Sequence, residues 1–321
     1  MRNSGSSKTI KNLHKLIMKT TNIVHGFLAM NIKTLVAVFF STCLLYSAVG
    51  QGALTPPGAP AAMMKTLDQI EPRTPVNTNT APGNSSAQFV ISQPGSYYLT
   101  GNITSAGVSG QNGIEIVTNN VTLDLNGFSL LAVQNIASGN NTVHDSAIYL
   151  TSNCNNITVR NGIISGWGLT GLYAVSSAND TFEHLTVVDN MWGMDCLGRV
   201  IIKDCLVASN SWNGIAIVPG SDGSEVIDNE IAGNDTSGSS QLGALIIQSS
   251  NNRIEGNHIT GNSGAGIWIA TSAYLTDFNN IVIGNSVIGF GANNYIIVAG
   301  NDVGPIGNAS TNASPWANFS H

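Results

Sequence analysis

Val226-Ile-Asp-Asn-Glu-Ile231 opens a stretch of sequence in which one six-residue phrase occurs four times. The later copies are Ile254-Glu-Gly-Asn-His-Ile259, Val282-Ile-Gly-Asn-Ser-Val287 and Val298-Ala-Gly-Asn-Asp-Val303. The first three copies begin 28 residues apart, and a fixed period of this kind predicts a solenoid, whose repeats bury their apolar faces against each other. The fourth copy begins only 16 residues after the third, so it is either a cramped closing turn or a copy out of register.

A second phrase, a small residue followed by apolar, any and apolar residues, recurs through the chain. It occurs at Gly113-Ile-Glu-Ile, Ala147-Ile-Tyr-Leu, Gly171-Leu-Tyr-Ala, Gly193-Met-Asp-Cys, Gly214-Ile-Ala-Ile, Gly243-Ala-Leu-Ile and Gly266-Ile-Trp-Ile. Short alternating runs predict strands with one buried face, and no helical pattern separates them. Such strands must pair with their equivalents one turn further along. We therefore expect an all-β fold, a single parallel β-helix with Gly and Asn at its corners.

The Asn of the six-residue phrase has a structural explanation. Asn229, Asn257 and Asn285 would lie above one another in successive coils, where their amides can form a hydrogen-bonded ladder. We favour this explanation over a ligand-binding role.

The expected organisation has four parts. Residues 1–50 read as a signal segment, because Lys33 precedes a short apolar run that ends in small residues. Residues 51–86 form a linker with a short capping helix at about 61–70, residues 87–304 the β-helix, and residues 305–321 a C-terminal tail or cap. The protein is then secreted (extracellular, periplasmic or at the cell surface), with no membrane span after cleavage; an uncleaved N-terminal anchor is the alternative.

The charge balance excludes some partners. Six of the twelve basic residues lie in residues 1–50 and none of the eighteen acidic ones does, so the remainder carries a net charge of −12. A surface this acidic repels nucleic acid and anionic membranes. It also disfavours polyanionic glycans unless a cation such as Ca²⁺ bridges them; no cofactor is otherwise indicated. Of the three remaining cysteines, Cys196 and Cys205 could form a disulfide, or Cys154 and both of these are buried core residues.

Three segments carry a family resemblance: Leu67–Pro75, Ile91–Ile103 and Val121–Phe128. They resemble secreted bacterial right-handed parallel β-helix repeat proteins of the pectate-lyase-like superfamily. The resemblance implies a right-handed coil over residues 61–321. It does not specify an activity, because that superfamily contains lyases, hydrolases, epimerases, adhesins and non-catalytic modules. The Asn-Thr-Asp, Gly-His-Gly and Arg-Ile-Lys signatures of its polygalacturonase-like hydrolases and the Asp-Pro-His-Glu signature of alginate epimerases are missing here.

Aromatic and acidic side chains predict a ligand-binding face. The middle residues of the second phrase point outward in one column: Glu115, Tyr149, Tyr173, Asp195, Ala216, Leu245 and Trp268. A second set, Trp167, Trp192 and Trp212, occurs once per coil at the turn before that strand. Aromatic faces beside carboxylates suit sugar rings. The alternative is that these aromatic residues only cover their neighbours.

The candidate catalytic residues are Asp195, His184, Asp204 and Arg160. A His beside acids is able to transfer protons. The structural alternative is a surface charge ladder of Arg160, Glu183 and Lys203, with His184, Asp204 and Asp228 exposed beside it.

Three functions remain open. The first is a secreted monomer that binds polysaccharide or cell-surface glycan along the Tyr149, Tyr173 and Asp195 face. The second is a polysaccharide lyase or glycoside hydrolase, and the sequence leaves open whether the protein is an enzyme. The third is a non-catalytic surface spacer or adhesin. No metal-binding cluster is indicated by the sequence.

Overall fold

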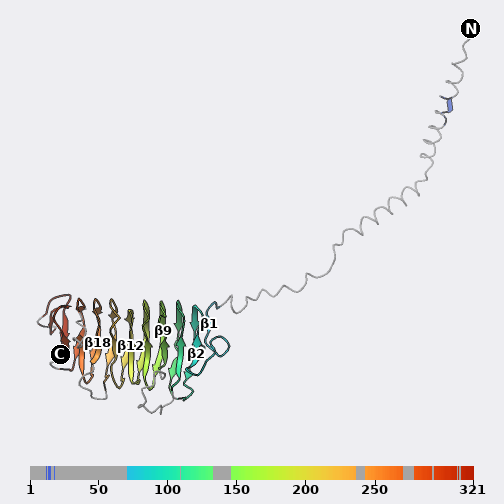
Figure 1. The fold of residues 1–321 in the computed structure, drawn as a ribbon. Helices are drawn as coiled ribbons and strands as arrows, with labels where there is room; N and C mark the ends of the chain where they lie inside the picture. The colour runs from blue at the N-terminus through green and yellow to red at the C-terminus, as the bar shows by residue number, and fades with distance from the viewer. Residues whose placement is uncertain are drawn as a thin grey trace, which may run out of the picture. The chain divides into compact units, whose positions relative to one another are not determined.

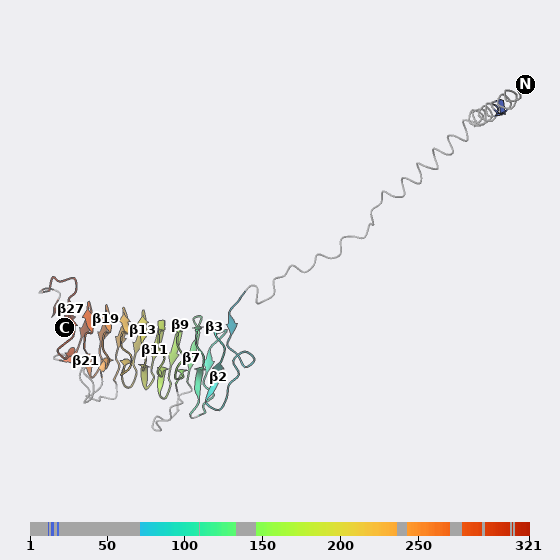
Figure 2. The ribbon, with the colours of Figure 1, turned by 45° about the horizontal axis from the view of Figure 1, so that its top comes forward.

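The computed structural model describes residues 71–108, 110–132, 146–235, 243–269, 278–290, 293–308, 310 and 312–321, with four single positions near the N-terminus. The signal segment and the capping helix expected at about 61–70 lie outside these residues, the four single positions apart. The unit Lys65–His321 is a stack of parallel coils along one axis, from β1 and β2 at one end to β27 at the other (Figures 1 and 2). Within the described residues, no helix combines the length and apolar character that membrane crossing needs.

Each coil contributes strands to three walls. The first wall is a nine-stranded sheet in which every neighbouring pair is parallel. Its strands, in order, are β2 (Ala87–Ile91), β5 (Asn112–Ile116), β8 (Ile148–Leu150), β10 (Thr170–Ala174), β12 (Trp192–Cys196), β15 (Ile215–Ile217), β18 (Gly243–Ile247), β21 (Ala265–Ile269) and β24 (Tyr295–Ile297). Strand order thus follows chain order, which confirms the predicted parallel β-helix.

The second and third walls share one larger sheet, because two long strands continue across the corner between them. These are β9 (Ile157–Ser165) and β11 (Asp180–Val188), whose first halves lie in the second wall and second halves in the third. The second wall also contains β1 (Thr74–Pro75), β3 (Gly95–Tyr98), β6 (Val121–Asp124), β13 (Val200–Lys203), β16 (Glu225–Ile227), β19 (Arg253–Glu255), β22 (Ile281–Ile283) and β25 (Asp302–Val303). The third contains β4 (Ile103–Thr104), β7 (Ser129–Leu131), β14 (Leu206–Ala208), β17 (Glu230–Ala232), β20 (His258–Thr260), β23 (Ser286–Ile288), β26 (Ile306–Gly307) and β27 (Asn318–Ser320).

The inward side chains of the three walls form one continuous apolar core. On the first wall Ile114, Ile148, Leu172 and Met194 lie above one another with at most 1% exposure. Cys154, Cys196 and Cys205 are free thiols buried in this core, so the alternative of a Cys196–Cys205 disulfide is not realised.

Asparagine ladders run along the corners, as expected for Asn229, Asn257 and Asn285. The side-chain Nδ2 of Asn229 donates to Oδ1 of Asn257 at 3.0 Å, and Asn257 donates in the same way to Asn285 at 2.9 Å. Each Oδ1 also accepts the backbone amide of the residue one coil earlier, at 3.0 Å for Cys205 and 3.1 Å for Asn229. Two further ladders have the same side-chain bonds: Asn190, Asn210 and Asn234, and Asn252, Asn280 and Asn301. Asn262 Oδ1 extends the first of them by accepting the Asn234 backbone amide.

The fourth copy of the six-residue phrase is out of register. Its Asn301 accepts a hydrogen bond from Asn280, whereas Asn285 donates to Asn318 at 3.1 Å. The segment expected as a tail or cap therefore contributes β27 to the third wall and extends the Asn229 ladder.

The small residue of the second phrase is required by packing. A Cβ placed on Gly193 would lie 2.2 Å from the Gly214 carbonyl oxygen and 2.7 Å from Val207 Cγ1. At β18 this position is taken by Ala244 and not by Gly243. Leu245 pairs with Ile267 and Ile246 with Trp268, so the residue opposite Gly266 of the next phrase is Ala244. The expected outward position of Leu245 was wrong: Leu245 is fully buried, and Ile246 lies in the column instead.

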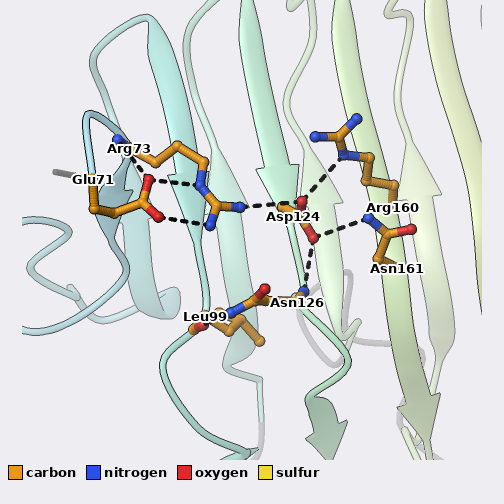
Figure 3. Close-up of polar contacts among 7 residues, drawn as sticks. All are labelled: Glu71, Arg73, Leu99, Asp124, Asn126, Arg160 and Asn161. Atoms are coloured by element: carbon orange, nitrogen blue, oxygen red, sulfur yellow. Dashed lines mark hydrogen bonds and ion pairs between the residues drawn. The ribbon is translucent and has the colours of Figure 1, made fainter.

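A network of charges lies where the described chain enters the first coils (Figure 3). Arg73 donates to Glu71 at 2.8 and 2.9 Å and to Asp124 at 3.3 Å. Arg160 approaches the same Asp124 oxygen at 3.3 Å, and Asn161 and the Asn126 backbone amide donate to the other oxygen. The Arg73 guanidinium also lies 4.7 Å over the ring of Tyr98. Arg73 thus joins the entering segment to the second wall.

Candidate functional site

The outer face of the first wall carries the predicted column. Strand pairing places Glu115, Tyr149, Tyr173 and Asp195 opposite one another in four successive coils. Ala216, Ile246 and Trp268 continue the column over the next three coils. Because neighbouring strands lie about 4.8 Å apart, the face from Glu115 to Trp268 is about 29 Å long.

The aromatic residues at the start of this column contact each other. The ring centroids of Tyr149 and Tyr173 are 5.7 Å apart with an interplanar angle of 51°. Glu115 Oε2 accepts a hydrogen bond of 2.9 Å from the Ser86 hydroxyl. Burial raises the pKa of both tyrosines above its ordinary value, with a further contribution from Glu115 to Tyr149 and from Asp195 to Tyr173. Both phenols are therefore neutral near pH 7.

Of the three expected indoles, two lie together and one does not. The rings of Trp192 and Trp212 have centroids 5.0 Å apart, and both side chains are partly exposed. Trp167 is only 1% exposed, and its Nε1 donates to the Leu130 carbonyl at 3.3 Å. Its ring fills the space beside Gly113, where an added Cβ would lie 2.7 Å from the indole. The expectation that Trp167 binds ligand on the outer face was therefore wrong.

A cleft of about 610 Å³ begins at Trp192 and Asp195 and follows the first wall to Trp268 and Ile296. Its lining combines indole faces and aliphatic side chains with polar groups. These are Trp192, Asp195, Asn213, Ala216, Val218, Ile246, Gln248, Ser263, Gly264, Ala265, Trp268, Asn293 and Ile296. The size and the mixture of apolar surface with few polar groups suit a small organic ligand or part of a polymer. Sequence reasoning selected Trp192, Asp195 and Trp268 from this set; nothing in the sequence singled out Asn213.

Asp195 is the one ionisable side chain among the described residues that line the cleft. Burial raises its pKa from 3.8 to about 6. Its Oδ1 is buried and has no hydrogen-bond partner among the described residues. A carboxyl group with this pKa exchanges its proton near neutral pH, so it can donate or accept a hydrogen bond according to its ligand.

The remaining catalytic candidates lie on other walls. Asp195 belongs to the nine-stranded sheet, whereas Arg160 is on the second wall and His184 and Asp204 are at the corner between the second and third walls. The His184 Nε2 lies 3.9 Å from Asp204 Oδ2, and both side chains are about half exposed. Both residues have positive φ, of 53° and 55°, as does Asp228, so this column forms an exposed turn.

Ion pairs on the second wall explain Arg160 without catalysis. Arg160 Nε lies 3.3 Å from Asp124 Oδ2, and Lys203 Nζ lies 3.0 Å from Glu183 Oε2. Glu183 lies between Arg160 and Lys203 in the strand register. Among the described residues, no group of three or more His, Cys, Asp or Glu side chains could hold a metal ion. The structure therefore brings Asp195 together with the aromatic residues and not with His184, Asp204 or Arg160.

The comparisons with known proteins concern the fold. Residues 146–303 match the family model described as right handed beta helix region. The chain is similar to the Dettilon tailspike protein, with a TM-score of 0.49 and 14% identity over 63% of this chain and 42% of that one. It is also similar to the A-module of the Azotobacter vinelandii mannuronan C-5 epimerase AlgE4, with a TM-score of 0.36 and 13% identity over 64% and 53% of the two chains.

A third similar structure is the enzymatically active domain of bacteriophage CBA120 tailspike protein 2. Its TM-score is 0.41, at 14% identity over 77% of this chain and 45% of that chain. The chain thus spans about half the length of these three structures, or less. No curated protein matches it. At these identities the likeness concerns the fold alone.

Proposed function

Since residues 146–303 form a right-handed β-helix region, we propose that this solenoid serves as a scaffold for binding polysaccharide along the outer face of its first wall. The binding face consists of Tyr149, Tyr173, Trp192, Asp195 and Trp268, together with the cleft between the last three. We propose in addition that the protein is secreted, so that glycans outside the cytoplasm are its ligands.

The observation that carries this proposal is the alignment of aromatic and polar groups along one face. Sugar rings stack their C–H faces on aromatic rings, and their hydroxyls donate to carboxylate and amide oxygens. The Tyr149–Tyr173 pair and the Trp192–Trp212 pair supply the former, and Asp195 the latter. A linear polymer extended along the solenoid axis would contact both the tyrosines and the cleft.

Affinity chromatography on immobilised polysaccharides tests the proposal. Tyr173→Ala and Trp192→Ala each remove a partly exposed ring, so we expect the retention on the matching polysaccharide to be lost. The matched control is Leu206→Ala, which removes an apolar side chain of 38% exposure from the third wall and should leave retention unchanged. Equal retention of all three variants and the parent protein would dismiss the proposal.

A second candidate function is cleavage of the bound glycan. It is favoured by two properties of Asp195, namely its pKa of about 6 and a side-chain oxygen without a hydrogen-bond partner in the described part of the chain. Both suit a proton donor in the cleft. Product release from a polysaccharide panel, measured with and without Ca²⁺, separates binding from cleavage. Asp195→Asn should stop cleavage while stacking on Trp192 persists; a panel that yields no product leaves binding as the function.

A further inference from the structure

Two residues that line the cleft each have a buried side-chain oxygen with no hydrogen-bond donor among the described residues. One is Asn213, which is 3% exposed, and the other is Asp195; the oxygen is Oδ1 in both. A buried acceptor without a donor costs about 1–3 kcal/mol, so a ligand that supplies donors gains this energy on binding.

The two residues lie on adjacent coils. The Gly193 amide of β12 donates to the Asn213 carbonyl at 3.0 Å, so the backbone of Asn213 lies beside that of Trp192. Asp195 follows three residues later on the same strand. Trp192, Asp195 and Asn213 thus belong to neighbouring positions of the first wall.

The charge of the cleft selects among possible ligands. Asp195 is the only ionisable group among its described lining residues, and the chain from residue 51 onward has eighteen acidic and six basic residues. An anionic ligand such as a uronic acid polymer is repelled here, because none of the lining residues that the structure describes carries a positive charge. A positively charged donor is attracted by the carboxylate, by the net charge and by the face of an indole.

We infer that the cleft binds a glycan with free amino groups, whose ammonium donates to Asp195 and whose neighbouring donors reach Asn213. This inference rests on the proposed function, polysaccharide binding, and specifies amino-group-bearing glycans as the class of ligand. The ammonium group has three donors and so can satisfy the carboxylate directly. An ammonium near Asp195 also favours the ionised carboxyl group, which offsets the burial that raises its pKa.

Isothermal titration calorimetry of the full chain with four probes tests the inference. The probes are a glucosamine oligosaccharide, its fully N-acetylated form, a galacturonate oligosaccharide and CaCl₂ alone. We expect the glucosamine oligosaccharide to bind at least tenfold more tightly than the N-acetylated form at pH 6.5, and the galacturonate oligosaccharide not to bind.

Substitutions assign the preference to the cleft. Asp195→Asn preserves the shape of the side chain and should reduce the preference for the amine over the acetamide to about twofold or less. Asp228→Asn is the matched control, because it removes the same charge from an exposed corner with φ of 54° that Asn tolerates; it should retain the preference.

The outcomes separate the inference from the proposed function. Equal binding of the amine and acetamide probes, both weakened by Trp192→Ala, would overturn the inference and leave glycan binding intact. Binding of none of the glycans would overturn both. Ca²⁺ binding that depends on Asp195, without any preference for the amine probe, would show that the carboxylate serves a metal ion and would also overturn the inference.

Discussion

Asp180 is a buried carboxyl group in a corner position that uncharged polar side chains occupy on later coils. It is 1% exposed, and its Oδ1 accepts the Ile157 backbone amide at 2.9 Å. The equivalent acceptors on later coils are the Ser224 hydroxyl and the Asn252 amide oxygen. Burial raises the pKa of Asp180 from 3.8 to about 6, despite the opposing effects of the hydrogen bonds from Ser177 and Ile157. Folding therefore shifts the equilibrium of this group toward its protonated, uncharged form.

The sign of the pH dependence follows. Because the pKa is raised on folding, the folded state binds more protons, so this group favours folding most below pH 3.8 and the advantage is lost as the pH rises through about 6. The difference between 3.8 and about 6 corresponds to about 3 kcal/mol between the two limits. Asp180→Asn removes the titration and keeps the acceptor for Ile157. Its new Nδ2 has a precedent in Asn252, which donates to the Ser249 hydroxyl three residues earlier at 2.9 Å.

Urea denaturation of the parent protein and of Asp180→Asn at pH 3.5, 5.5 and 7.5 measures the effect. We expect nearly equal stability at pH 3.5 and an advantage of up to about 3 kcal/mol for Asp180→Asn at pH 7.5. Asp228→Asn, at an exposed corner, is the matched control and should show no such growth with pH. A variant that is destabilised to the same extent at every pH would refute the reasoning.

Two further predictions concern the ladder and the charge network. Asn257→Ala leaves Oδ1 of Asn285 without its side-chain donor and the amide of Asn229 without its acceptor, so it should cost about 2–4 kcal/mol in urea denaturation. Asn102→Ala removes an exposed acceptor of the Ser129 amide and should cost less than half of that; equal costs would contradict the ladder's role. Arg73→Ala removes the contacts to Glu71 and Asp124, so hydrogen exchange at the Val76 amide should accelerate while the Ile281 amide is unaffected; unchanged exchange at Val76 would show that Arg73 does not hold the entering segment.

The coil repeat was predictable from sequence because it depends on local spacing. The 28-residue period of Asn229, Asn257 and Asn285 fixed both the pairing direction and the ladder that the structure contains. The outward column could be predicted equally well wherever a glycine or alanine marked the start of the second phrase. The prediction failed at β18, where Ala244 and not Gly243 occupies the small position, so the outward residue was placed at Leu245, one position too early.

The burial of side chains at the corners was not predictable in the same way. Trp167, Trp192 and Trp212 have similar sequence contexts, yet only Trp167 turns inward, because Gly113 on another coil leaves room for its ring. Asn213 shares its residue type with many turn positions, and its place in the cleft follows from the coils around it. Likewise His184 and Asp195 are eleven positions apart in sequence and on different walls. Such outcomes depend on three-dimensional neighbours that the spacing alone does not specify.

The asparagine ladders have a direction, and this has a consequence for how the molecule can change in length. In the ladder of Asn229 each amide gives its proton to the coil that follows and receives one from the coil before. An inserted 28-residue coil would find the same donor on the coil before it and the same acceptor on the coil after it. Deletion of one coil would bring an equivalent donor and acceptor together. Insertion of a whole coil therefore leaves each amide of this ladder with its hydrogen-bond partners. The outer face of the first wall can thus lengthen by duplication without a change at either end.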